Sequence, residues 1–232
     1  EIILVGTAHV SRKSAELIRT VITEEHPDSV CVELDEDRYR NMQNPGAWEK
    51  TDVVQVIRQK RVGFLLANLV LGSYQKRIAK NLNTVAGQEM LQGIESAGEI
   101  NAELVLADRK IQTTFLRLWR KLGLWEKCKL FFMLLFSFAE SPEISETDVN
   151  SLLEPENLET AITELRDKFP VIGEVLIDER DRHLAHMIRS APGQKVVAVL
   201  GGAHVPGVKE EIFKVRDIGD ISEVPPGNPV FK

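Results

Sequence analysis

Two segments of the sequence share a pattern in which a short apolar run is followed by glycine, two residues, histidine and valine. They are Gly6-Thr7-Ala8-His9 near one end of the chain and Gly201-Gly202-Ala203-His204 near the other. Histidine readily binds metal ions and transfers protons near neutral pH. Gly6 and Gly201 are expected to let the chain turn sharply off each strand. Two such copies predict one functional site, with hydrogen bonding at the strand ends as the structural alternative.

Two further apolar runs also end in polar side chains. Glu33 closes the second run and is followed by Arg38, while Asp108 and Arg109 follow the third. Open α/β sheets bind ligands outside the carboxyl ends of their strands, where the ends of parallel strands meet. The sequence therefore predicts that these side chains lie near both histidines.

The residue types at this edge allow two kinds of chemistry. His9, Glu33 and His204 together could hold a divalent ion such as Mn²⁺, Co²⁺ or Zn²⁺, which would acidify a bound water. Without a metal, a histidine could act as general base while the arginines hold an anionic intermediate. Both mechanisms fit the sequence. A serine nucleophile is disfavoured because the chain has no Gly-x-Ser-x-Gly motif.

Three candidates lie on predicted helices. Glu89 is either a solvated helix residue or a site carboxylate. Glu179 and Arg182 are three positions apart and share one helix face, which fits a surface ladder of ion pairs or two side chains that reach into the site.

The arrangement of apolar runs and helical patterns predicts a single α/β domain over residues 1–232. Its central sheet is expected to be mostly parallel and flanked by helices, because strands and helices alternate. Two helical insertions are expected, one after the second strand at about 40–100 and one between the third and fourth strands at about 113–170. The strands are predicted at residues 1–5, 29–34, 103–107 and 195–200, and the principal helices at 11–25, 52–67, 74–96, 113–139, 158–168, 171–190 and 205–213.

Composition limits the class of protein. The net charge of −6 argues against a nucleic-acid-binding surface. Cys31 lies in an apolar run and is predicted to be a buried free thiol, which fits a reducing compartment. The stretch 113–139 is rich in aromatic residues, with a wide apolar face. That face indicates either burial within the second insertion or contact with a second copy of the chain or a membrane surface.

Six stretches, in order along nearly the whole chain, resemble the TraB/PrgY family, which is related to the Tiki proteases. They are Gly6-Thr-Ala-His9-Val, Val32-Glu33-Leu-Asp35-x-x-Arg38-Tyr39, Gly87-Gln-Glu89-Met90, Leu106-Ala107-Asp108-Arg109, Asp178-Glu179-Arg180-Asp181-x-x-Leu184-Ala185 and Gly201-Gly-Ala-His204-Val.

The resemblance implies a function that spacing alone does not. Tiki members are membrane-associated, metal-dependent proteases, and PrgY-like members act in peptide-pheromone shutdown. The matching site positions would be His9, Glu33, Arg38, Arg109, Arg182 and His204. We therefore expect a metal-dependent hydrolase acting on a peptide or small molecule, or else a regulator that sequesters a peptide without cleaving it. We expect a soluble domain at the cytoplasmic face of a membrane-anchored protein, tethered by segments outside this sequence.

Overall fold

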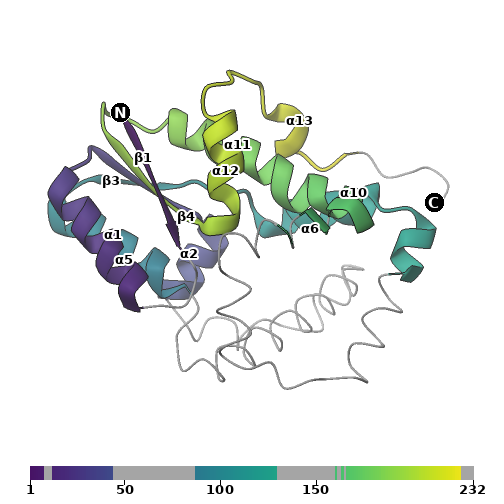
Figure 1. Ribbon diagram of the computed structural model, residues 1–232, viewed down its shortest axis with the longest axis horizontal. Coiled ribbons are helices and arrows are strands. Elements are labelled where there is room, and N and C mark those ends of the chain that lie inside the picture. Colours follow the sequence, from purple (N-terminus) through teal and green to yellow (C-terminus); the bar gives the residue numbers. More distant parts are fainter. Residues whose placement is uncertain (8–11, 44–86, 130–159, 161–162, 165, 226–232) are drawn as a thin grey trace.

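The computed structural model describes residues 1–7, 12–43, 87–129, 160, 163–164 and 166–225. Its centre is a four-stranded, fully parallel sheet in the order β1-β4-β2-β3 (Figure 1). The strands are β1 (Ile2–Thr7), β2 (Ser29–Val32), β3 (Glu103–Leu106) and β4 (Val196–Gly201). All four predicted strands and their parallel arrangement are confirmed.

Helices cover both faces of this sheet. The helices whose full bounds fall within the described residues are α1 (Arg12–Glu25), α2 (Glu36–Gln43), α5 (Gln88–Ile100), α6 (Ile111–Lys121), α10 (Pro170–Gly173), α11 (Glu179–Arg189), α12 (Val205–Glu211) and α13 (Gly219–Ser222). A π-helical turn, η2 (Glu174–Asp178), joins α10 to α11, and a 3-10 turn, η3 (Gly202–His204), joins β4 to α12.

The strands bury alternate side chains on the two faces. Val30 and Val32 pack with α1 and α5 on one side, while Cys31 packs with α11 and α12 on the other (Figure 1). This α/β/α layering explains why the strands read as continuous apolar runs. Cys31 is a fully buried free thiol, as predicted, and burial raises its pKa to about 12.

The predicted turn at Gly6 is wrong, whereas at Gly201 the chain does leave its strand for η3, but without a left-handed backbone conformation. β1 continues through Gly6 to Thr7, and β4 includes Gly201, whose φ of −60° and ψ of 136° are ordinary extended values. Among the described glycines, positive φ values occur only at Gly87 and Gly193. Position 6 is a glycine because there is no room for a side chain: a Cβ there would lie 2.9 Å from Cγ2 of Val205.

The two predicted insertions fall largely outside the described residues and stay predictions. α5, which lies in the first of them, packs directly on the sheet beside α1. The predicted helix 113–139 begins within α6 and is interrupted at Leu122 and Gly123. Trp119 and Trp125 are exposed, but residues 130–139 lie outside the described part, so both interpretations of this stretch remain open. None of the described helices is long and apolar enough to span a membrane.

Candidate functional site

Glu33 lies immediately after β2, where the sheet places it beside the end of β4. One carboxylate oxygen, Oε2, accepts a hydrogen bond from the backbone N–H of Gly201 at 2.7 Å. The other, Oε1, accepts one from Nη2 of Arg180 at 2.5 Å. The side chain is buried and held at both oxygens, so its position at the carboxyl edge of the sheet is well defined.

His204 ends the 3-10 turn η3 after β4 and faces Glu33. Its Nε2 lies 3.6 Å from Oε1 of Glu33, and its Nδ1 lies 2.6 Å from Oδ1 of Asp181. An ionised carboxylate only accepts hydrogen bonds, so an ionised Asp181 would favour the imidazole tautomer with a proton on Nδ1. In the neutral ring, Nε2 then presents a lone pair toward an anionic oxygen. A cation between these two atoms would remove the repulsion.

Asp181 itself is buried in the first turn of α11. Burial raises the pKa of its carboxyl, and the hydrogen bond from His204 opposes that rise. The backbone of α12 passes close by at Gly207, where a Cβ would lie 1.9 Å from Oδ2 of Asp181.

Arg180 and Arg38 share the carboxylate of Asp108 behind Glu33. Arg180 donates through Nε and Nη2 at 3.2 and 2.7 Å, and Arg38 donates through Nη2. Arg38 also bonds Asp35 at 3.1 Å and the backbone carbonyl of Glu33 at 3.2 Å. Burial alone would raise the pKa of Asp108, but Arg180 and Arg38 outweigh it and hold that pKa below its ordinary value.

The charges of this cluster do not balance. Carboxylates come from Glu33, Asp35, Asp108 and Asp181, whereas guanidinium groups come from Arg38 and Arg180. With His204 neutral, the described part of the cluster is therefore negative. Buried anions need compensation, so this edge favours an additional cation or proton.

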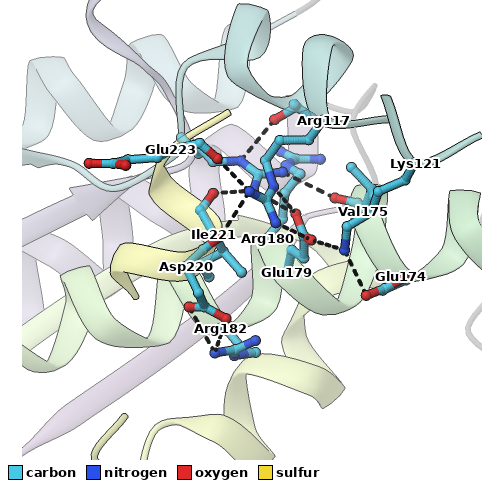
Figure 2. Close-up of polar contacts among 12 residues, drawn as sticks. Arg117, Lys121, Glu174, Val175, Glu179, Arg180, Arg182, Asp220, Ile221 and Glu223 are labelled. Carbon is cyan, nitrogen blue, oxygen red and sulfur yellow. Dashed lines mark hydrogen bonds and ion pairs between the residues drawn. The ribbon is translucent and has the colours of Figure 1, made fainter. Parts of the chain in front are cut away.

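Arg109 and Glu179, which are next in sequence to Asp108 and Arg180, belong to a second buried cluster. Glu179 accepts hydrogen bonds from Arg117 at 2.7 and 2.8 Å and from Lys121 at 2.8 Å (Figure 2). It also accepts one from Arg109 at 2.8 Å. Arg109 also bonds the backbone carbonyls of Ile221 and Val175. This cluster holds α6, α11 and α13 together, so its geometry is that of a stabilising ion-pair network.

Comparisons with known proteins agree with this arrangement of motifs. The sequence profile described as the TraB/PrgY/gumN family matches residues 1–219. This chain belongs to the TraB/PrgY/gumN family.

Relatives of the chain extend beyond the matched region. It is 33% identical to an uncharacterized protein of Methanocaldococcus jannaschii over 95% of this chain and 55% of that protein. It is 30% identical to a TraB domain-containing protein of Bos taurus, and 29% identical to that of Homo sapiens, in each case over 96% of this chain and 65% of the relative. The TraB chain thus spans between about half and two thirds of the length of these relatives.

Of the site residues predicted for this TraB-family chain, the structure brings together Glu33, Arg38 and His204. Arg182 lies elsewhere, with Nη2 3.4 Å from both carboxylate oxygens of Asp220 (Figure 2). His9 lies outside the described residues, but Thr7 pairs with Gly201, so the two motifs start on adjacent strands. Within the described part of the chain, no three histidine, cysteine or acidic side chains are grouped as a metal site.

Glu89 is buried in the first turn of α5, with 2% of its surface exposed. Its Oε2 has no hydrogen-bond partner among the described residues. Gly93, one turn further on the same face, lies against Val32 and Val199 near the ends of their strands. Because α5 leads back into β3, Glu89 lies beyond Gly93 toward the carboxyl edge of the sheet, although no hydrogen bond among the described residues joins it to Glu33 or His204.

Sequence reasoning missed Arg180 and Asp181 as site residues. It favoured the pair Glu179 and Arg182 because their spacing places them on one helix face. A usable signal lay in the apolar positions of the same helix. Leu184 and Ile188 are fully buried against the sheet, and stepping back one turn from Leu184 along that face reaches Arg180 and Asp181.

Proposed function

We propose that the edge formed by Glu33 and His204 is the catalytic site of a metal-dependent, peptidase-like hydrolase. The observation that carries this proposal is the orientation of His204, whose Nε2 faces Oε1 of Glu33 at 3.6 Å while Asp181 engages Nδ1. Metal-binding histidines are typically held in this way, with the second ring nitrogen bonded to a carboxylate.

The residues fit a divalent ion. His204 and Glu33, with His9 of the first motif, would hold Mn²⁺, Co²⁺ or Zn²⁺, and the negative charge of the described cluster favours such an ion. When bound, the ion would lower the pKa of a coordinated water and polarise a substrate carbonyl.

The remaining side chains have roles that need no metal. Arg180 and the N–H of Gly201 hold the Glu33 carboxylate in place. Arg38 is the more exposed guanidinium, with 34% of its side-chain surface exposed. It uses Nε and Nη2 for internal bonds, and Nη1, which makes no hydrogen bond to another described residue, would bind the carboxylate or developing oxyanion of a peptide or small-molecule substrate.

Metal analysis and turnover on one set of purified proteins test this proposal. The wild type, His204→Ala, Glu33→Gln and the surface control Lys209→Ala would be titrated with Mn²⁺, Co²⁺ and Zn²⁺ and incubated with a peptide library. We expect metal binding and cleavage in the wild type and control, and a loss of at least about tenfold in affinity in the two site variants. Absence of metal binding and of cleavage in the wild type would overturn the proposal.

One observation favours a second candidate, a regulator that binds a peptide without cleaving it. Both oxygens of Glu33 already accept hydrogen bonds, and Oε1 would have to be shared between Arg180 and an ion. A site saturated in this way can bind a ligand through Arg38 without activating water. Stoichiometric binding with intact peptide recovered by mass spectrometry would support this candidate. We also propose that this domain lies at the cytoplasmic face of a membrane, tethered by segments outside the sequence.

A further inference from the structure

A buried carboxylate on α11 stands behind His204, on the side opposite Glu33. Asp181 is 3% exposed, and its Oδ1 lies 2.6 Å from Nδ1 of the imidazole. Nδ1 and Nε2 lie on opposite sides of the ring, so a carboxylate at the first determines what the second can present to Glu33.

Space for Asp181 is provided by a glycine on a different element. Gly207 lies in α12, and a Cβ there would approach Oδ2 of Asp181 to 1.9 Å and its Cγ to 2.6 Å. Gly207 is not among the described residues with positive φ, so its backbone conformation suits any residue. Glycine is therefore required here for room, because any side chain would displace the carboxylate from His204.

We propose that Asp181 is a positioning residue, which fixes the Nδ1–H tautomer of His204 and aims the Nε2 lone pair at Oε1 of Glu33, and that Gly207 creates the space for it. The consequence for metal binding rests on the function proposed above. Carboxylates behind metal-binding histidines raise ligand basicity, and their loss typically costs about 10- to 100-fold in metal affinity.

The tautomer can be measured in the metal-free wild type, which needs no variant to fold. Long-range ¹H–¹⁵N correlation spectra of the imidazoles, assigned with His204→Ala, report which nitrogen of His204 carries the proton at a pH where the ring is neutral. We expect the proton on Nδ1 in the wild type. In Asp181→Ala, where the acceptor is gone, we expect a mixture of both tautomers. A wild-type proton on Nε2 would overturn the proposal.

Cobalt titrations then test the consequence, with visible absorbance as the readout. Asp181→Ala and Gly207→Ala should each weaken Co²⁺ binding by about 10- to 100-fold relative to the wild type. The matched controls are Asp178→Ala, an exposed acid on the preceding turn, and Gly98→Ala, where an added Cβ meets nothing within 4 Å. Both controls should bind like the wild type. Wild-type affinity in folded Asp181→Ala and Gly207→Ala would count against the positioning role.

The two experiments separate this inference from the proposed function. A wild type with the Nδ1–H tautomer that binds no Co²⁺ would leave the positioning role intact and remove the metal site. A wild type that binds Co²⁺ with His204 protonated on Nε2 in its metal-free form would retain the metal site and remove the role of Asp181.

Discussion

Gly6 of the first motif lies against the side chain of Val205, the residue that follows the histidine of the second motif. A Cβ on Gly6 would come within 2.9 Å of Cγ2 of Val205 and 3.7 Å of the Cα of Gly202. The two motifs are thus in contact across β1 and β4, and the first glycine of one is required by the packing of the other.

Replacing Gly6 by alanine should therefore destabilise the domain. Val205 is β-branched and cannot easily move away, so overpacking should cost about 1–3 kcal/mol in the free energy of unfolding. Urea denaturation would measure it. Gly98→Ala, which adds a methyl group in open space on α5, should instead be neutral or stabilising. Gly6→Ala should cost much less in a Val205→Ala background; an equal cost in both backgrounds would contradict the packing explanation.

Stability at acid pH should depend on Glu179. Burial raises the pKa of this carboxyl, but hydrogen bonds from Arg117, Lys121 and Arg109 outweigh it and lower the pKa to about 2. A depressed pKa in the folded state stabilises the protein above the unfolded value near 4.5, and this stabilisation disappears as the pH falls toward 2.

Glu179→Gln should consequently lower the free energy of unfolding by about 3 kcal/mol at pH 7, because it leaves buried cations without their anion. The difference from the wild type should shrink between pH 4.5 and 2, as shown by urea titrations across that range. A difference that is independent of pH would mean that the ionised carboxylate is not the stabilising form.

Arg180 and Arg182 should respond very differently to substitution, although they are two residues apart. Arg180→Ala leaves Glu33 and Asp108 buried without their shared cation. We therefore expect the free energy of unfolding to fall by about 3–5 kcal/mol and metal binding to be lost. Arg180→Lys should not restore function, because an ammonium cannot span both carboxylates as a planar guanidinium does. Arg182→Ala removes a long contact to exposed Asp220, the one ion pair that this side chain makes among the described residues, and should lower the free energy of unfolding much less than Arg180→Ala does. Thermal unfolding and metal titration of the three variants would rank their stabilities and metal affinities.

His183 should resist protonation. Burial lowers the pKa of its imidazole to about 4, and Nδ1 has no hydrogen-bond partner among the described residues. Because the unfolded chain takes up this proton near pH 6.5, stability should fall as the pH drops from 6.5 to 4. His183→Gln should remove that part of the pH dependence. An NMR titration midpoint for His183 near 6.5 would contradict the burial.

The sequence predicted the four strands because each is a short, mostly apolar run, fully buried in β2 and β4 and partly exposed in β1 and β3 at the sheet edges. It also placed Glu33 and His204 at one edge, since parallel strands bring their carboxyl ends together. Strand order was beyond reach, because apolar patterning does not say which strand is the neighbour of which.

The choice between Arg180 and Arg182 failed for a local reason. The sequence predicted one regular helix over 171–190, but the π-helical turn η2 (Glu174–Asp178) interrupts the α-helical register just before Glu179. Glu179, Arg180, Arg182 and Leu184 all lie after this turn, within α11, so the 3.6-residue spacing still holds among them. The error was to pair Glu179 with Arg182 instead of following the buried positions Leu184 and Ile188 back one turn to Arg180 and Asp181.

The place of β4 has a consequence for how the chain folds. The last strand in sequence lies between the first two, so β1 and β2 have no direct pairing with each other. A nascent chain lacking residues 196–201 carries β1 without β4, the strand with which it pairs, and the edge with Glu33 does not yet exist. Contacts this distant along the chain close slowly, so the domain should acquire its site late, in the step that inserts β4.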